Sequence, residues 1–122
     1  MSVFDANNLG IAFIYCNGSK TNYLIDYLGD VFNCKTKKFL KIHSRIPSAS
    51  SNGTYKFFKY RFNGKAHKRI WSRQMMISFY PVPNMDNLEV DHINTWDEDY
   101  FHNWQWLTKE ANLAKRQFDT PF

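Results

Sequence analysis

This chain has few cysteines, no long apolar stretch and, over a large central segment, no acidic residue. The two cysteines, Cys16 and Cys34, form no Cys-x-x-Cys pair, which argues against a structural zinc site, and their low number suits a reducing compartment. No stretch approaches the roughly 18 apolar residues that a bilayer-spanning helix needs. Asp5 precedes every Lys and Arg, so the N-terminus does not begin as a signal peptide does. We therefore expect a cytoplasmic protein without membrane contact.

The missing acidic residues define a basic segment. Between Val31 and Met85 there is no Asp or Glu, although the same segment holds 12 of the 16 basic residues. Six of the 11 acidic residues then follow between Asp86 and Asp99. This order indicates a surface that binds a polyanion beside a site that binds a cation. The alternative is a basic surface that only keeps the domain soluble, but the length of the acid-free run favours nucleic acid.

The length and apolar content indicate one small domain of the α+β class. With 122 residues, of which 43% are hydrophobic, the chain can form a single core. We expect small antiparallel β-hairpins in a basic DNA-binding part, residues 1–85, and two strands and a helix in residues 86–122, joined as one compact unit. Short strands are expected at residues 11–15, 23–25, 30–32 and 38–42, and a linker or loop at residues 47–53.

The strongest turn signal is Asn63-Gly64, because a type I′ turn requires positive φ at both central positions. Residues 55–62 and 65–71 flank it and should form a hairpin in which basic and aromatic side chains loosely alternate. A two-stranded ribbon fits the major groove of DNA. The hairpin residues that we expect to contact DNA are Lys56, Lys59, Arg61, Lys65, Lys68 and Arg69.

The remaining segments predict two helices and a second strand pair. Ser72 is expected to cap a short helix, residues 73–79, that ends before Pro81 and Pro83. Residues 88–93 and 104–107 should be strands, with Thr108 capping a final helix to about residue 117. Asn112 would then face the strands from the first turns of that helix. Further expected DNA contacts are Arg73, Lys115 and Arg116.

One constellation near the C-terminus carries metal-dependent chemistry. Val90-Asp91-His92-Ile93 ends a predicted strand, Asn103 lies in the loop that follows, and Asn112 lies on the next helix. Phosphodiester hydrolysis needs a base and oxygen ligands for a hard cation, and these residue types supply both. Adjacent strand residues point to opposite faces, so we expect the strand to end, twist or bulge at Asp91 and His92.

Glu89 to Asn112 resembles the HNH module of phage and intron-encoded homing endonucleases, with supporting likeness at residues 23–32 and 71–83, over roughly residues 21–117 in all. The resemblance implies a ββα-metal fold around one divalent cation, Mg²⁺ or Mn²⁺. It implies that His92 is the general base, that Asp91 and Asn112 hold the metal, and that Asn103 orients the hairpin through side-chain to backbone hydrogen bonds.

The resemblance also implies a function. We expect a metal-dependent endonuclease that cuts double-stranded DNA to leave 5′-phosphate and 3′-hydroxyl ends, acting as a monomer or weak homodimer in a bacterial or phage-infected cell. One alternative is a catalytically inactive HNH-fold module that binds DNA or protein, because Asp97-Glu98-Asp99 makes the loop after His92 acidic. Another is an RNA-binding protein, since a basic patch alone does not distinguish the two polymers.

Overall fold

The computed structural model describes residues 10–45, 55–94 and 99–119, so the Ser-rich segment 47–53 lies outside the described residues. The elements, in chain order, are β1 (Ile11–Cys16), β2 (Ser19–Asp26), β3 (Val31–Asn33), β4 (Lys38–Phe39), β5 (His43–Arg45), β6 (Tyr55–Phe62), β7 (Lys65–Ile70), α2 (Trp71–Phe79), η1 (Met85–Asn87), β8 (Leu88–His92), η2 (Phe101–Asn103), β9 (Trp104–Thr108) and α3 (Lys109–Asp119). None of the described helices is long and apolar enough to cross a membrane.

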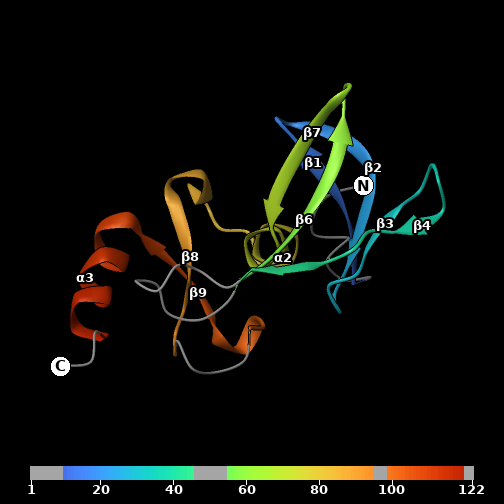
Figure 1. The fold of residues 1–122 in the computed structure, drawn as a ribbon. Coiled ribbons are helices and arrows are strands. Elements are labelled where there is room, and N and C mark those ends of the chain that lie inside the picture. Colours follow the sequence, from blue (N-terminus) through green and yellow to red (C-terminus); the bar gives the residue numbers. More distant parts are fainter. Residues whose placement is uncertain (1–9, 46–54, 95–98, 120–122) are drawn as a thin grey trace.

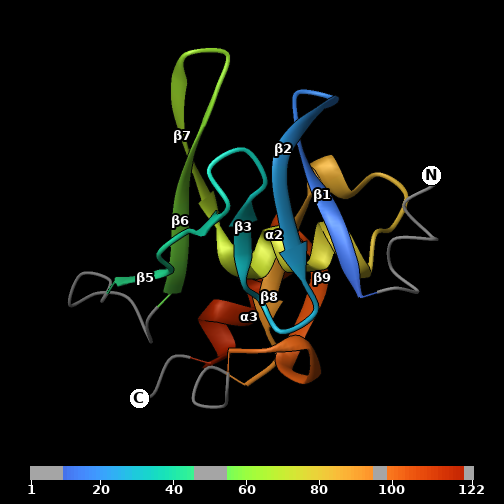
Figure 2. The same cartoon turned by 90° about the vertical axis from the view of Figure 1, so that its right-hand side faces the viewer.

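The described strands form three antiparallel sheets, which confirms the α+β class. Their orders are β1-β2-β3-β4, β5-β6-β7 and β8-β9. Helix α2 lies between the two N-terminal sheets and the β8–β9–α3 unit (Figures 1 and 2) and contacts β1, β6, β7 and β8. One helix therefore supports both the basic and the acidic part of the chain.

The core forms where α2 meets these sheets. Met75 of α2 is fully buried, as are Ile14, Ile25 and Phe58 from three different strands. Burying a side chain of this size contributes about 1.5–3 kcal/mol. These buried side chains and Met75 thus belong to one hydrophobic core.

Trp71, the first residue of α2, fixes the turn between β2 and β3. Its indole N–H donates to the carbonyl of Gly29 at 2.8 Å. Gly29 has φ +97°, and a Cβ there would lie 2.1 Å from the Trp71 ring. Only glycine permits both this backbone conformation and the close approach of the indole.

The Asn63-Gly64 hairpin is confirmed, but the start of α2 is not as predicted. Asn63 and Gly64 have φ of 52° and 75°, and β6 pairs with β7 from Phe57↔Ile70 to Phe62↔Lys65. The expectation that Ser72 caps the helix is wrong. The helix begins two residues earlier, with Ile70 at the N-cap position and no side-chain cap hydrogen bond, because burial of Trp71 places the first turn.

The C-terminal strands and helix form as predicted. Strands β8 and β9 pair without interruption from Leu88↔Thr108 to His92↔Trp104. Helix α3 packs against both strands. The Thr108 hydroxyl accepts a hydrogen bond from the Ala111 backbone N–H at 3.1 Å, which satisfies one of the free donors in the first turn.

Candidate active site

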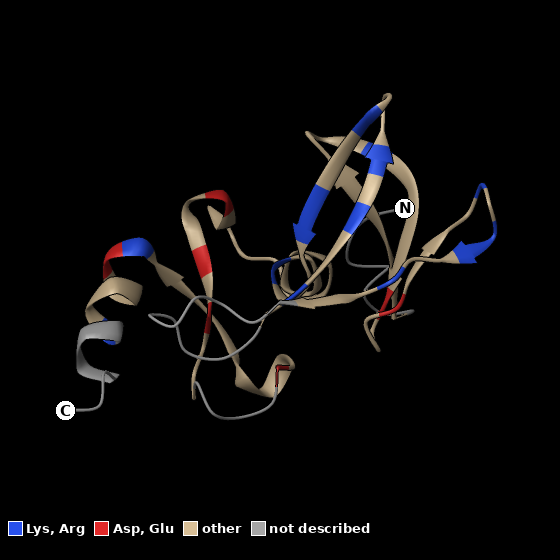
Figure 3. Cartoon of the chain, in the orientation of Figure 1, with Lys and Arg blue, Asp and Glu red and all other residues tan. Residues whose placement is uncertain are grey.

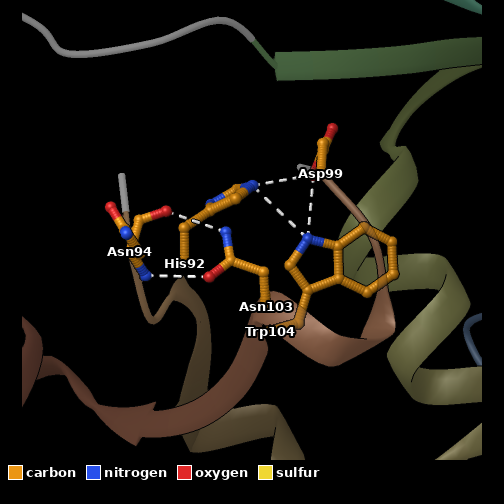
Figure 4. A network of polar contacts seen from close by, with 5 residues as sticks. All are labelled: His92, Asn94, Asp99, Asn103 and Trp104. Carbon is orange, nitrogen blue, oxygen red and sulfur yellow. Dashed lines mark hydrogen bonds and ion pairs between the residues drawn. The ribbon is translucent and has the colours of Figure 1, made fainter. Parts of the chain in front are cut away.

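Asn103 fastens the two ends of the loop that follows β8. Its side-chain oxygen accepts the backbone N–H of Asn94, and its side-chain nitrogen donates to the Asn94 carbonyl, both at 2.8 Å (Figure 4). Its own carbonyl accepts the N–H of Ile93 at 2.7 Å. Asn103 is only 3% exposed. These buried bonds hold the residues immediately after His92 against the start of β9.

His92 lies in a three-residue polar network. Its Nε2 lies 2.7 Å from Oδ1 of Asp99, and the indole N–H of Trp104 donates to the same Asp99 oxygen at 2.8 Å (Figure 4). The Trp104 nitrogen is also 3.3 Å from His92 Nε2. The His92 side chain remains 28% exposed, so solvent reaches the imidazole although one ring nitrogen is occupied.

Asp91 has a different set of neighbours, on the side of β8 that meets α3. Its carboxylate is 11% exposed, and Lys115 Nζ lies 3.3 Å from Oδ2. Gln105 donates to the same oxygen at 2.9 Å, and Lys115 also donates to the His92 carbonyl at 3.0 Å. A carboxylate buried to this degree needs a compensating charge. An ammonium group from α3 is therefore held between the Asp91 carboxylate and the His92 backbone.

Asn112 faces β8 from α3, as predicted. It is 5% exposed, and its side-chain nitrogen donates to Oε1 of Glu89 at 2.8 Å. Glu89 and Asp91 are two residues apart on β8, and Asn112 and Lys115 are three apart on α3, so all four side chains lie along one strand–helix contact. This contact gathers two carboxylates and an amide.

The chemistry of this donor set fits a hard divalent cation. Carboxylate and amide oxygens are the ligands that Mg²⁺ accepts, and it usually takes only one or two carboxylates from protein. The ammonium beside Asp91 shows that the contact already accommodates positive charge. Among the described residues, no three His, Cys, Asp or Glu side chains gather closely enough to hold a metal by themselves. A cation bound here would complete its shell with water or phosphate oxygens.

The structure thus brings Asp91 and Asn112 to one face and directs the His92 imidazole to other partners. Strand β8 ends at His92, one of the three possibilities expected at this pair, while the register with β9 contains no bulge. The Asn103 bonds begin immediately beyond this end. The roles of these four residues in metal binding and catalysis stay predictions.

An aromatic cluster joins this unit to the N-terminal sheet. Tyr27 stacks on Phe101 with ring centroids 4.6 Å apart, and the Tyr100 hydroxyl donates to the Tyr27 carbonyl. The hydrogen bond with Tyr80 raises the pKa of Tyr27 to about 12, and burial raises the pKa of Tyr100. Both phenols therefore stay neutral near neutral pH, and the junction does not change its charge there.

The β6–β7 hairpin carries several of the exposed basic residues, and others lie around the β3–β4 turn (Figure 3). Lys59 and Lys68 are directly opposite each other, and both are exposed. Like charges in this position repel each other and destabilise a sheet, so an anionic partner would relieve the repulsion. Arg61 lies on the same face, since it is two residues from Lys59. Lys68 also lies over Phe57, with Nζ 4.4 Å from the ring centroid.

Two of the arginines expected to contact DNA have partners within the fold. The Arg69 guanidinium donates to the side-chain oxygens of Gln74 and Tyr60. The Arg73 guanidinium donates to the carbonyls of Leu88 and Met85 at 2.7 and 3.0 Å and ties α2 to β8. The sequence shows the charge of these groups but not these acceptors. Their contact with DNA stays a prediction.

The other expected DNA contacts lie in different places. Lys65 is exposed at the start of β7, and Lys56 Nζ lies 4.8 Å from the centroid of the Trp71 ring. Lys115, expected to contact phosphate, is engaged by Asp91. The side chain of Arg116 lies outside the described residues.

The fold is that of the HNH homing endonucleases, as the sequence resemblance led us to expect. A solved structure on DNA binding and cleavage by the HNH homing endonuclease I-HmuI superimposes with a TM-score of 0.62 at 23% sequence identity. The match covers 88% of this chain and 58% of that one, so the chain spans somewhat more than half the length of I-HmuI. No family model and no curated protein matches the sequence.

Sequence reasoning missed the contacts of Asp99 and Lys115. The sequence places Asp99 with Asp97 and Glu98 in an acidic loop, whereas the structure shows its carboxylate in contact with the His92 imidazole. The sequence predicts that Lys115 contacts DNA, and the structure shows its ammonium beside Asp91. The available signal for Lys115 was its spacing of three residues from Asn112, which places the two on one helix face.

Proposed function

We propose that this chain is a metal-dependent DNA endonuclease in which His92 activates the attacking water. The observation that carries the proposal is the arrangement in the β8–β9–α3 unit. The partly exposed His92 imidazole stands at the end of β8, and Asn103 holds the backbone that follows it. The neighbouring contact between β8 and α3 supplies carboxylate and amide oxygens. The fold shared with an HNH homing endonuclease supports it. The chain is shorter than that enzyme, and its substrate is inferred from its own charges.

The proposed reaction is hydrolysis of one phosphodiester. His92 takes a proton from water, the water oxygen bonds to phosphorus, and the bond from phosphorus to the 3′ oxygen breaks. The 3′ oxygen leaves as a hydroxyl after gaining a proton, and the phosphate stays on the 5′ end. Neutral imidazole suits this step because it exchanges a proton near neutral pH. Asn103 would keep the backbone of Ile93 and Asn94, the two residues after His92, in place during the reaction.

Asp91 and Asn112 would hold the cation, Mg²⁺ or Mn²⁺, through a carboxylate and an amide oxygen. When bound, such a cation stabilises negative charge on the phosphate and on the departing oxygen. A cation bound at Asp91 would compete with Lys115, whose ammonium contacts Oδ2 of the same carboxylate. Freed from it, the ammonium would be available to a DNA phosphate, which is the contact that the sequence predicts.

The basic hairpin would bind the duplex through one face. Lys59, Arg61 and Lys68 are exposed and lie on that face. Lys56 lies on the opposite face, where it lines an open cavity of about 580 Å³ together with Trp71 and the carboxylates of Asp30 and Asp99. If about six phosphates are neutralised, DNA affinity should fall by roughly a thousandfold between about 50 and 200 mM salt.

The test is cleavage of end-labelled duplex DNA with Mg²⁺ or Mn²⁺, with His92→Ala and a chelator as controls. We expect cleavage products with 5′-phosphate ends, lost on chelation and reduced about 10²–10⁴-fold in His92→Ala. Cleavage that survives in His92→Ala would refute the assigned base. Salt-sensitive binding without cleavage, under either metal, would identify an inactive DNA-binding module. A preference for RNA over DNA in the same assay would refute the assigned polymer.

A further inference from the structure

We propose that Asp99 fixes the tautomer and orientation of the His92 imidazole, so that Nε2 carries the proton and Nδ1 is the basic nitrogen. This inference deepens the proposed function and rests on it for the reaction, but the arrangement itself can be measured without any cleavage. It gives a role to Asp99, although from the sequence alone the acidic loop that contains this residue favours an inactive module.

The proton positions follow from which groups can donate. An indole N–H only donates, and an ionised carboxylate only accepts. Trp104 donates to Asp99 Oδ1 at 2.8 Å, and His92 Nε2 lies 2.7 Å from the same oxygen. If Nε2 carried no proton, an imidazole lone pair would face a carboxylate oxygen at 2.7 Å. Both contacts are favourable only when Nε2 bears the proton and donates it to Asp99.

The longer Trp104 contact agrees with this assignment. The indole nitrogen lies 3.3 Å from His92 Nε2, which is 0.5 Å longer than its 2.8 Å bond to Asp99. The Asp99 carboxylate is therefore the closer acceptor of the indole N–H. Trp104 is 4% exposed, so its position is set by the core, and its indole N–H bonds to the same Asp99 oxygen that His92 Nε2 contacts (Figure 4).

The arrangement has two consequences for the chemistry. With Nε2 bonded to Asp99, Nδ1 is the ring nitrogen left to accept a proton from water. The hydrogen bond from Nε2 to Asp99 also fixes the orientation in which Nδ1 meets the water. Asp99 acts through His92, so it is a positioning residue. The Asp99 side chain is 19% exposed, which limits the screening of the contact between Asp99 and His92 by solvent.

The primary experiment is long-range ¹H–¹⁵N correlation NMR of histidine-labelled protein at alkaline pH, without metal or DNA. His92→Ala identifies the His92 signals. We expect wild-type His92 to show a protonated Nε2 and a bare Nδ1, and Asp99→Asn to lose this preference, because an amide can both donate and accept. Asp86→Asn is the matched control: Asp86 is exposed and removing its charge should leave the His92 signals unchanged.

A wild-type spectrum with the proton on Nδ1, or one that Asp99→Asn does not alter, would overturn the inference. In cleavage assays, Asp99→Asn should lower kcat about 100-fold and change KM less than about threefold. The same substitution in a His92→Ala background should have no further effect. Faster cleavage by Asp99→Asn would show instead that the carboxylate obstructs the site.

The two proposals fail separately. If the wild-type protein cuts no duplex with either metal while the NMR shows the expected tautomer, the endonuclease assignment fails and Asp99 still positions the imidazole. If the wild-type protein cuts DNA and Asp99→Asn cuts as fast as Asp86→Asn, the endonuclease assignment stands and the role of Asp99 is refuted.

Discussion

The basic hairpin and the β8–β9–α3 unit use charged residues in opposite ways. In the hairpin, Lys59 and Lys68 are exposed and lie directly opposite each other, where they repel. In the C-terminal unit, Asp91 is mostly buried and has a cationic partner, Lys115. Exposed like charges supply attraction for a polyanion, whereas buried paired charges fix geometry. Under the proposed function, this difference would place DNA binding and chemistry in separate regions.

The largest expected effect is the loss of metal affinity when the Asp91 carboxylate is removed. We expect Asp91→Asn to lower Mn²⁺ affinity by more than about 100-fold, since even loss of an outer-shell partner costs about 10–100-fold. Isothermal titration with Mn²⁺ measures this in the absence of DNA. Asp86→Asn removes an exposed charge of the same kind and should bind as the wild type does. Equal losses in both variants would mean that the acidic segment attracts cations only diffusely.

The next largest effect is expected from the packing of Trp71, at the start of α2, against Gly29. Gly29→Ala should destabilise the protein by about 2–4 kcal/mol, because it strains a positive φ and drives a Cβ into Trp71. Gly18 also has positive φ, 82°, but a Cβ there meets nothing within 4 Å. Gly18→Ala should therefore reduce the free energy of unfolding clearly less than Gly29→Ala does. Urea denaturation compares the two, and equal losses would show that the contact with Trp71 contributes little.

A smaller effect is expected from the hairpin surface. The triple variant Lys59→Ala, Arg61→Ala and Lys68→Ala should weaken duplex binding about 10–30-fold and make the salt slope shallower by about one unit for each lost phosphate contact. Fluorescence anisotropy at several salt concentrations measures both quantities. Weaker binding with an unchanged salt slope would show that these side chains do not contact phosphates.

The smallest effect concerns the ammonium beside Asp91. Lys115→Met should raise Mn²⁺ affinity about threefold to tenfold, because the cation no longer competes with a charge that is attracted to the same carboxylate. Lys109 is exposed at the start of α3, and Lys109→Met is the control. Reduced Mn²⁺ affinity in Lys115→Met alone would mean that Lys115 supports the site and does not compete for it.

The parts of the fold that were predictable depend on local chemistry. Asn63-Gly64 specifies positive φ at adjacent positions, and Thr108 supplies a cap oxygen at a helix start, so both features could be read from a few residues. The start of α2 could not be predicted from the neighbouring residues. Burial of Trp71 against Gly29, 42 positions earlier, outweighs the capping preference of Ser72.

The candidate site was predictable in its residues but not in their partners. The order Asp91, His92, Asn103 and Asn112 identified the unit, and the strand, loop and helix positions follow the sequence. The contacts of Asp99 and Lys115 depend on how a loop and a helix close over β8. The same holds for Arg73, whose acceptors are two backbone carbonyls with no sequence signature.

The division between binding and chemistry is tested most directly by the single-turnover cleavage rate of DNA that is saturated with protein. Saturation removes differences in affinity, so the hairpin triple variant should cut at the wild-type rate once bound, while Asp91→Asn should cut at least about 100-fold more slowly. If both variants cut equally slowly, or if Asp91→Asn keeps the wild-type rate, the chemistry does not reside in the β8–β9–α3 unit as described here.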